Sequence, residues 1–258
     1  MLLKVSILAA AASLGAAACG TTAEPSAAPI AETNCAAPQT AQPTAGLFET
    51  RTESQCGPTL DFSPINSYQG EITTVQARED AVVLVNGDCT GTLVAAQAGP
   101  IVLTAGHCVG LGDRPLLAFN VEANPDGDQL ATNGTVIEQS SKPDYALIRL
   151  DKLPAIAPSL LTSRSSDLLA IIQHPRGGPK VIAEGNIAGI CNGMIFYTNL
   201  DTLVGSSGAG VLNRQGYLLG VHTDGDCAAD GSGSNYGWTA ASIVQASSYL
   251  QDTDIGDR

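Results

Sequence analysis

The chain has 258 residues, of which 12 are basic and 25 acidic, giving a formal net charge of −13. This balance argues against a nucleic-acid-binding protein and against a polybasic membrane-surface protein, because both depend on clustered Lys and Arg. Hydrophobic residues make up 44% of the chain, enough for a packed core, and the 28 glycines and 14 prolines favour an all-β domain with many turns.

The N-terminus has the pattern of a secretory signal. Lys4 precedes an apolar stretch over residues 5–18 that ends in three alanines, and about 14 residues are too few to span a bilayer comfortably. Cys19 follows at once, where a bacterial lipoprotein has its lipidated cysteine, although Ala16 replaces the usual leucine. Two outcomes stay open. One is an envelope protein, for example of the outer membrane, whose only membrane contact is a lipid on Cys19; the other is a soluble secreted protein cleaved after residue 18.

Residues 19–65 are rich in Ala, Pro and Thr and show no sustained apolar period, which predicts a tether or a pro-segment. Cys35 and Cys56 lie within it and would clip it to a following domain. The chain has 7 cysteines, a number typical of an exported protein in an oxidising compartment. Lipidation of Cys19 would leave six of them for three disulfides.

From residue 66 onward, short apolar runs alternate with turn residues, as at 81–85, 101–104, 145–150 and 217–222. Strands at this spacing predict a sandwich or a barrel and not alternating β and α units. The one convincing helical pattern covers residues 242–251. The sequence therefore predicts a signal peptide over 1–18, a tether or pro-segment over 19–65 and an all-β domain over 66–258.

Three motifs have residues suited to nucleophilic catalysis, in the order His, Asp, Ser. His107 lies in Leu-Thr-Ala-Gly-His-Cys at 103–108, Asp144 directly precedes an apolar run, and Ser207 lies in Gly-Ser-Ser-Gly. A serine hydroxyl needs an imidazole to accept its proton, and the imidazole needs a carboxylate to fix its tautomer. Each motif alone is more often structural, as a core histidine, a turn cap or a loop. Their combination predicts a catalytic triad.

Together the motifs resemble those of the chymotrypsin/trypsin-like serine peptidases, and in particular the secreted bacterial branch that includes glutamyl and lysyl endopeptidases. The resemblance covers about residues 68–250. It implies two six-stranded antiparallel β-barrels with the active site between them and a short C-terminal helix. The implied activity is that of a serine endopeptidase with an acyl-enzyme intermediate, a polypeptide substrate and no cofactor. The expected state is a monomer.

The resemblance also implies roles for individual residues. Ser207 would be the nucleophile, His107 the general base and then acid, and Asp144 the orienting carboxylate. The amides of Gly205 and Ser207 would form the oxyanion hole. A disulfide would join Cys89 to Cys108. The remaining cysteines allow three pairings, and the sequence does not choose among them: Cys35, Cys56, Cys191 and Cys227.

Substrate preference depends on residues near the nucleophile and on the segment 220–225, which resembles the family strand that lines the specificity pocket. The expected substrate-binding residues are Thr202, His222, Thr223 and Gly225. Thr202 and His222 look like the pair with which glutamyl endopeptidases hold a carboxylate, because an imidazolium and a hydroxyl can both donate to one. A preference for Glu or Asp before the scissile bond follows. A purely structural role for His222 stays open.

Two aspartates favour the opposite preference. Asp201 stands where trypsin has the aspartate that selects Lys and Arg, and Asp224 is close in sequence to His222. A second departure from trypsin concerns activation. Ser206 replaces the aspartate that receives the new N-terminal ammonium, so this switch is expected to be missing, and any latency would come from residues 20–60 covering the cleft.

Other functional classes fit less well. No Cys-x-x-Cys or His-x-x-x-His spacing occurs, and residues 126–128 lack the pattern of a calcium loop, so no metal is expected. An α/β-hydrolase esterase conflicts with the order of the motifs. A catalytically silent trypsin-fold binding protein of the envelope stays open, because Gly208-Ala209-Gly210 is less constrained than the usual proline-containing sequence. His174, in His-Pro-Arg-Gly-Gly, is expected to be structural.

Overall fold

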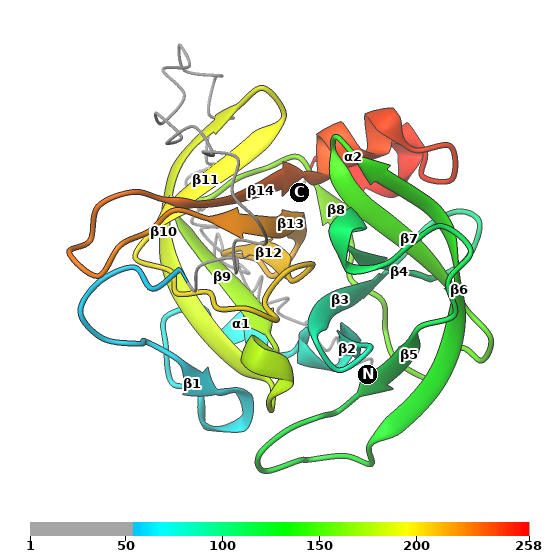
Figure 1. Ribbon diagram of the computed structural model, residues 1–258, viewed down its shortest axis with the longest axis horizontal. Helices are drawn as coiled ribbons and strands as arrows, with labels where there is room; N and C mark the ends of the chain where they lie inside the picture. The colour runs from blue at the N-terminus through cyan, green and yellow to red at the C-terminus, as the bar shows by residue number, and fades with distance from the viewer. Residues whose placement is uncertain (1–53, 258) are drawn as a thin grey trace, which may run out of the picture.

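The computed structural model describes residues 54–257 (Figure 1). Six antiparallel strands close the first barrel in the order β2-β3-β4-β7-β6-β5. They are β2 (Val82–Val85), β3 (Cys89–Val94), β4 (Ile101–Thr104), β5 (Leu116–Phe119), β6 (Leu130–Ser141) and β7 (Asp144–Leu150). Their short apolar stretches are separated by tight turns. The turn between β2 and β3 places Asn86 and Gly87 at φ values of 53° and 83°, a region that these two residue types adopt most readily.

The second barrel follows in the order β12-β9-β10-β11-β14-β13, and pairing of β12 with β13 closes it. Its strands are β9 (Leu168–Gln173), β10 (Val181–Cys191), β11 (Met194–Thr198), β12 (Gly210–Asn213), β13 (Leu218–Gly225) and β14 (Asn235–Thr239). Three two-residue strands pair at its edges: β1 (Ser63–Pro64) with β10, β8 (Leu161–Thr162) with β13, and β15 (Ile255–Gly256) with β8. The expected pair of six-stranded barrels is confirmed.

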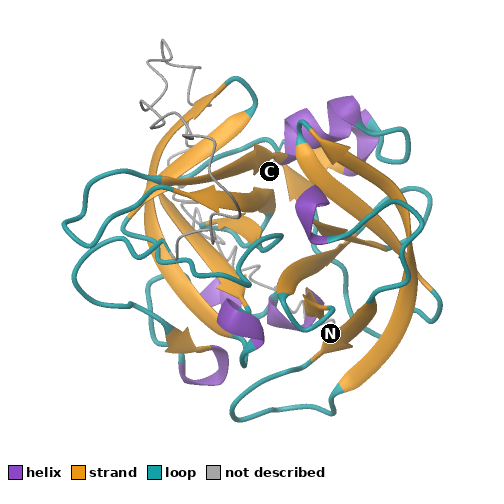
Figure 2. Ribbon diagram, viewed as in Figure 1, coloured by secondary structure: helices purple, strands orange, loops and turns teal. Residues whose placement is uncertain are grey.

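Helices are short and lie around the barrels (Figure 2). They are α1 (Thr73–Gln76), α2 (Ala240–Ala246) and the 3-10 turns η1 (Ile65–Ser67), η2 (Glu79–Ala81), η3 (Gly106–Cys108), η4 (Pro175–Gly177) and η5 (Asp252–Asp254). The C-terminal helix is present, but it begins at Ala240 and ends at Ala246 instead of covering 242–251. It ends early because the hydroxyls of Ser247 and Ser248 donate to the Glu138 carboxylate of β6.

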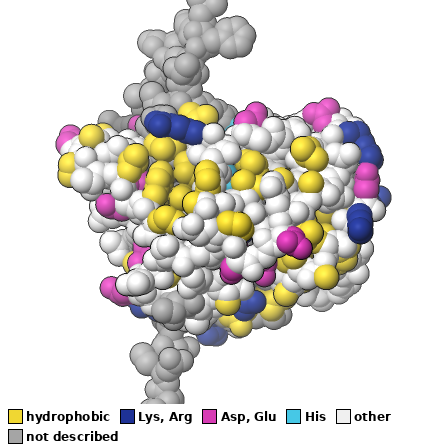
Figure 3. Space-filling view, turned by 90° about the horizontal axis from the view of Figure 1, so that it is seen from below, with side chains coloured by type: hydrophobic (Ala, Val, Ile, Leu, Met, Phe, Trp, Pro, Cys, Tyr) yellow, Lys and Arg dark blue, Asp and Glu magenta, His cyan; other side chains and the backbone are white. Residues whose placement is uncertain are grey.

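The buried side chains form one apolar core inside each barrel and a third cluster between the barrels, the C-terminal helix and the segment before β2. In the part of the chain that the structure describes, no helix is long and apolar enough to cross a membrane. On the face shown in Figure 3, acidic side chains are scattered, some of them in the middle of the face, and the basic ones lie toward the edges and form no continuous patch. Nothing on this face suggests a surface for a polyanion.

Candidate active site

His107 and Asp144 meet at the surface of the first barrel. His107 lies in η3, directly after β4, and Asp144 is the first residue of β7, which pairs with β4. The imidazole Nδ1 donates to Asp144 Oδ2 at 2.6 Å, and the His107 amide donates to Asp144 Oδ1 at 3.0 Å. A Cβ on Gly106 would lie 2.1 Å from the Ser140 carbonyl oxygen, so only glycine permits this close approach. Asp144 therefore holds both the ring and the backbone of His107.

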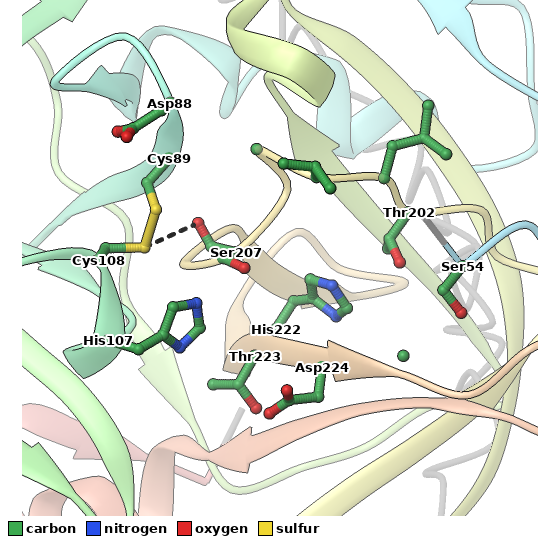
Figure 4. Close-up of a pocket in the computed structure, with 14 residues that line it drawn as sticks. Ser54, Asp88, Cys89, His107, Cys108, Thr202, Ser207, His222, Thr223 and Asp224 are labelled. Atoms are coloured by element: carbon green, nitrogen blue, oxygen red, sulfur yellow. Dashed lines mark hydrogen bonds between the residues drawn. A yellow bond between two sulfur atoms is a disulfide. The ribbon is translucent and has the colours of Figure 1, made fainter. Parts of the chain in front are cut away.

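Ser207 lies in the loop that leads into β12 of the second barrel, and it lines the same cleft as His107. Figure 4 shows the two side chains beside each other, next to the Cys89–Cys108 disulfide. The preceding residue, Ser206, closes the turn with two reciprocal bonds. Its amide donates to the Leu203 carbonyl at 2.9 Å, and its hydroxyl accepts from the Leu203 amide at 3.0 Å. A local hydrogen bond thus stabilises the turn at the position where trypsin-type enzymes have an aspartate.

The amides of Gly205 and Ser207 also line the cleft. No residue within 54–257 accepts a hydrogen bond from either amide. Backbone N–H groups are strong donors and are usually paired when a fold buries them. Two unpaired amides beside Ser207 therefore provide a place where a negatively charged oxygen would be stabilised.

The disulfide between Cys89 and Cys108 joins β3 to η3, with an S–S distance of 2.00 Å and Cα atoms 6.2 Å apart. It links β3, which pairs with β4, to the residue after His107, and this is the pairing that the resemblance implies. A second disulfide joins Cys56 to Cys227, and Cys191 is also disulfide-bonded. Cys19 and Cys35 lie outside the described residues.

On the other side of Ser207 the cleft deepens into a pocket lined by buried polar side chains of Thr202, His222 and Thr223. The Thr202 hydroxyl accepts from Asn235 Nδ2 at 3.1 Å, so its own proton is left to donate. The Thr223 hydroxyl has no hydrogen-bond partner among residues 54–257.

A buried tyrosine fixes the ring of His222. The Tyr197 hydroxyl lies 2.5 Å from His222 Nδ1, and Tyr197 is completely buried on β11. Burial, together with the nearby Asp224 carboxylate, raises the pKa of Tyr197 well above 10, so the phenol keeps its proton and shares a hydrogen bond with Nδ1. The contact between Tyr197 and Nδ1 therefore fixes the orientation of the His222 ring in the pocket lining.

Asp201 does not contribute its carboxylate to the pocket. Its Oδ1 accepts from the Cys56 amide and its Oδ2 from the Asp61 amide, both at 2.6 Å. These two bonds use the carboxylate to attach the segment 56–61 to the second barrel. Two acidic residues remain in the lining, the exposed Asp88 and the partly exposed Asp224, whereas Thr202 and His222 are buried.

The sequence analysis missed Ser54, which is part of the pocket lining and lies in the segment expected to be a tether or pro-segment. Ser54 pairs with Thr202 through two backbone hydrogen bonds of 3.1 and 3.3 Å. Its hydroxyl interacts with the Asn235 side chain and accepts from the Cys227 amide at 2.9 Å. Gly225 is adjacent, and a Cβ on it would lie 2.3 Å from Ser54 Cβ. Cys56 was the one sequence signal for this attachment.

Comparisons with known proteins place this geometry in a family. A family model described as a trypsin-like peptidase domain matches residues 89–221, just over half of the chain. The chain belongs to this family. No curated protein matches it significantly.

Solved structures of serine proteases share the fold. An inactive mutant of Rv3671c from M. tuberculosis H37Rv superimposes with a TM-score of 0.54 at 19% identity, covering 68% of this chain and 88% of that chain. A serine endoprotease from Yersinia pestis superimposes with a TM-score of 0.56 at 16% identity, covering 69% of this chain and 65% of that chain. The MamO protease domain from Magnetospirillum magneticum superimposes with a TM-score of 0.53 at 17% identity, covering 68% of this chain and 98% of that chain. The chain is a trypsin-like serine protease. These matches do not assign it to the glutamyl or lysyl endopeptidase branch.

Proposed function

We propose that this protease is an exported endopeptidase that cleaves polypeptides through Ser207, His107 and Asp144. The observation that supports this most directly is the arrangement of the cleft. His107 is held by Asp144 through Nδ1, which leaves Nε2 for the serine, and Ser207 lies beside it with two unpaired amides. This is the set of parts that acyl transfer requires: a nucleophile, an oriented base and donors for the developing oxyanion.

The reaction then follows from these groups. Ser207 Oγ attacks the carbonyl carbon of the scissile bond while its proton passes to His107 Nε2, and the Asp144 carboxylate stabilises the imidazolium that forms. The amides of Gly205 and Ser207 donate to the tetrahedral oxyanion. The C–N bond breaks, and His107 gives its proton to the leaving amine. Water, deprotonated by His107, attacks the acyl-enzyme in the same way and releases the carboxylic acid and the free serine.

Substitution of the nucleophile tests this proposal. Ser207→Ala should reduce hydrolysis of a denatured protein substrate by about a million-fold in kcat, because the residues of a triad act as a unit. Thermal unfolding of the variant should stay close to that of the wild type, since a small side chain is shortened at the edge of the cleft. Retention of most of the activity by a folded Ser207→Ala protein would exclude Ser207 as the nucleophile. Absence of activity in the wild type would favour the silent binding protein.

For the substrate, we propose a preference for Glu or Asp before the scissile bond. Two buried side chains of the pocket lining support it: Thr202, whose hydroxyl has a proton left to donate, and His222, whose ring is held in place by Tyr197. Hydrogen bonds to a carboxylate are about twice as strong as those between neutral groups. With Asp201 engaged by the N-terminal segment, its carboxylate does not oppose an acidic side chain inside the pocket.

Asp224 supports the alternative, a preference for Lys or Arg, because it is an acidic group in the lining close to His222. It is partly exposed, so solvent screens its field more than that of the buried groups. The acidic and the basic preference can be distinguished with a set of peptides that differ only in the residue before the scissile bond, which is Glu, Gln, Asp, Lys or Arg. The acidic preference requires the highest kcat/KM for Glu or Asp, and the basic alternative requires it for Lys or Arg.

We also propose that the enzyme acts outside the cytoplasm. The signal-like N-terminus and the disulfides Cys56–Cys227 and Cys89–Cys108 support an oxidising compartment. Metabolic labelling with a radioactive fatty acid separates the two forms of export, because a lipid on Cys19 would label the wild type but not Cys19→Ser. A protein without label that is found free outside the cells would be the soluble secreted form.

A further inference from the structure

Thr90 is a buried residue of β3 that touches the nucleophile loop from the opposite barrel. It follows Cys89 of the disulfide, and its side chain is fully buried. Its amide donates to the Ser207 carbonyl at 2.9 Å, and its hydroxyl donates to the Gly205 carbonyl at 2.8 Å. One residue of the first barrel thus holds the peptide groups that follow Gly205 and Ser207, two residues that line the cleft.

The Thr90 hydroxyl is itself held in place. It accepts from the His174 amide at 3.0 Å, and the Thr90 carbonyl accepts from the Thr104 hydroxyl at 2.7 Å. A hydroxyl that accepts from an N–H has one proton left, and here that proton can only be directed at the Gly205 carbonyl. The side chain is therefore oriented before any substrate arrives.

The turn after His174 fixes the neighbouring peptide. The Arg176 amide, in η4, donates to the Val204 carbonyl at 2.5 Å. In a trans peptide the C=O and N–H groups point in opposite directions. Because the Val204 carbonyl points at the turn, the N–H of Gly205 in the same peptide points away from it. A Cβ on Gly205 would lie 2.6 Å from the His174 carbonyl oxygen, so the loop packs directly on the turn.

We propose that Thr90 is a positioning residue of the oxyanion hole: through its hydroxyl it joins the His174 turn to Gly205 and keeps the Gly205 and Ser207 amides directed into the cleft. The inference rests on the proposed function, since it concerns how the proposed oxyanion hole is held. In trypsin-type enzymes an ion pair between an aspartate and the new N-terminal ammonium holds this loop. Ser206 stands at the position of that aspartate and has no charge with which to form the pair. Here neutral hydrogen bonds from the first barrel hold the loop continuously.

The chain provides a matched control in Thr92. It lies on the same face of β3, two residues further on, and it is equally buried. Its hydroxyl has no hydrogen-bond partner among residues 54–257. Thr→Val at either position exchanges a hydroxyl for a methyl group in the same strand, but only at Thr90 does the exchange remove contacts to the nucleophile loop. Thr90→Ser keeps the hydroxyl and serves as the rescue.

The test compares the exported wild-type protein with Thr90→Val, Thr90→Ser and Thr92→Val on one peptide substrate and on a peptide aldehyde, which forms a tetrahedral adduct with a serine. For Thr90→Val we expect kcat to fall about 10- to 100-fold, less than the effect of removing an oxyanion donor outright, with KM within about twofold. The aldehyde should bind more weakly by a similar factor. Thr90→Ser should restore most of both values, and Thr92→Val should equal the wild type.

Several results would overturn the inference. The first is a folded Thr90→Val protein whose kcat equals that of the wild type. The second is a fall in kcat for Thr92→Val as large as that for Thr90→Val. The third is a fall in kcat for Thr90→Val that disappears once the activity is corrected for the unfolded fraction of the protein. The amide signals of Gly205 and Ser207 in NMR spectra give a readout that needs no activity, and they should shift in Thr90→Val but not in Thr92→Val. An inactive wild type would contradict the proposed function, whereas unchanged amide signals in Thr90→Val would contradict this inference alone.

Discussion

At the scale of single residues, tertiary contacts decide which function a motif residue has. Asp201 has the sequence position of a residue that selects basic side chains, yet both of its oxygens accept amides from a segment about 140 positions earlier in the chain. Ser206 replaces a charged residue and stabilises the same turn by bonding to Leu203. Neither role can be predicted from the adjacent residues, because the partners of Asp201 are distant in sequence and the hydrogen bond of Ser206 depends on the conformation of the turn.

The hydrogen bond between Tyr197 and His222 leads to a prediction for selectivity. Tyr197→Phe removes the hydrogen bond at His222 Nδ1 that fixes the orientation of the ring, so the imidazole is held less firmly toward the substrate carboxylate. We expect the preference for Glu over Gln, measured as the ratio of kcat/KM values, to fall by about tenfold, which corresponds to roughly one charge-assisted hydrogen bond. Hydrolysis of a neutral peptide ester should change little.

Tyr249→Phe is the matched control for that variant, because Tyr249 lies near Arg149, in contact with the C-terminal part of the core and outside the pocket lining. It should keep the wild-type selectivity. Equal selectivity in Tyr197→Phe and the wild type would mean that His222 is a structural wall residue, the reading that the sequence alone leaves open.

At the scale of elements, the segment 54–61 changes the boundary of the active site. The sequence analysis placed it in a tether or pro-segment, because it has no apolar period. In the structure Ser54 pairs with Thr202, and the Cys56–Cys227 disulfide ties the segment to the loop after β13. Any processing that leaves the pocket complete must therefore occur before Ser54.

Removal of this disulfide should weaken substrate binding more than catalysis. We expect Cys56→Ala combined with Cys227→Ala to raise KM for a Glu peptide several-fold while kcat stays within about threefold, because the triad and the Thr90 contacts lie elsewhere. The free energy of unfolding should fall by about 2–4 kcal/mol. Urea titration and steady-state kinetics measure both, and Leu60→Ser, at an exposed position of the same segment, is the control. A fall in kcat at constant KM would contradict the assignment of this segment to the pocket.

The strands themselves were predicted well, because period and turn residues are local signals. The end of α2 was not: the apolar period continues to residue 251, but the carboxylate of Glu138 in β6 offers Ser247 and Ser248 a better partner than the helix does. The residues of the proposed triad could be predicted because each of their three motifs is continuous in sequence. Thr90, Ser54 and Tyr197 act through contacts between distant elements, and nothing near them in the sequence marks them as functional.

At the scale of the whole molecule, a buried cluster connects the two barrels. Lys180, directly before β10 of the second barrel, donates to carboxyl oxygens of Glu79 and Glu122, which flank the first barrel, and Glu122 also accepts from Asn66. Burial raises the pKa of Glu79 to about 8. Burial opposes ionisation of Glu122 too, but hydrogen bonds from Lys180 and Glu79 lower its pKa. At neutral pH the ammonium thus faces one carboxylate and one carboxylic acid.

This arrangement predicts losses of stability of very different size for two substitutions. Lys180→Met leaves the Glu122 carboxylate buried without its cation and should lower the free energy of unfolding by about 3–5 kcal/mol. Glu79→Gln imitates the protonated acid and should cost less than about 1 kcal/mol at pH 7. Urea titrations give both values, with Lys152→Met on the surface as the control. Equal costs for Lys180→Met and Lys152→Met would show that the cluster does not stabilise the contact between the barrels.

The same cluster sets a pH dependence with a definite sign. Because the pKa of Glu79 is higher in the folded than in the unfolded chain, its stabilising contribution is complete below about pH 4.5 and is lost as the pH rises through about 8. The wild type should lose stability relative to Glu79→Gln over that range. A constant difference between the two proteins from pH 5 to pH 8.5 would contradict the raised pKa.

The central claim is that Ser207 is an activated nucleophile in a cleft whose oxyanion donors are already in place. Reaction with a fluorophosphonate, followed by mass mapping of the adduct, tests it most directly, because the reagent needs both an activated serine and an open oxyanion hole. We predict one adduct, on Ser207, in the full chain or in a chain that begins at Ser54. No adduct on Ser207 in either form would contradict the claim.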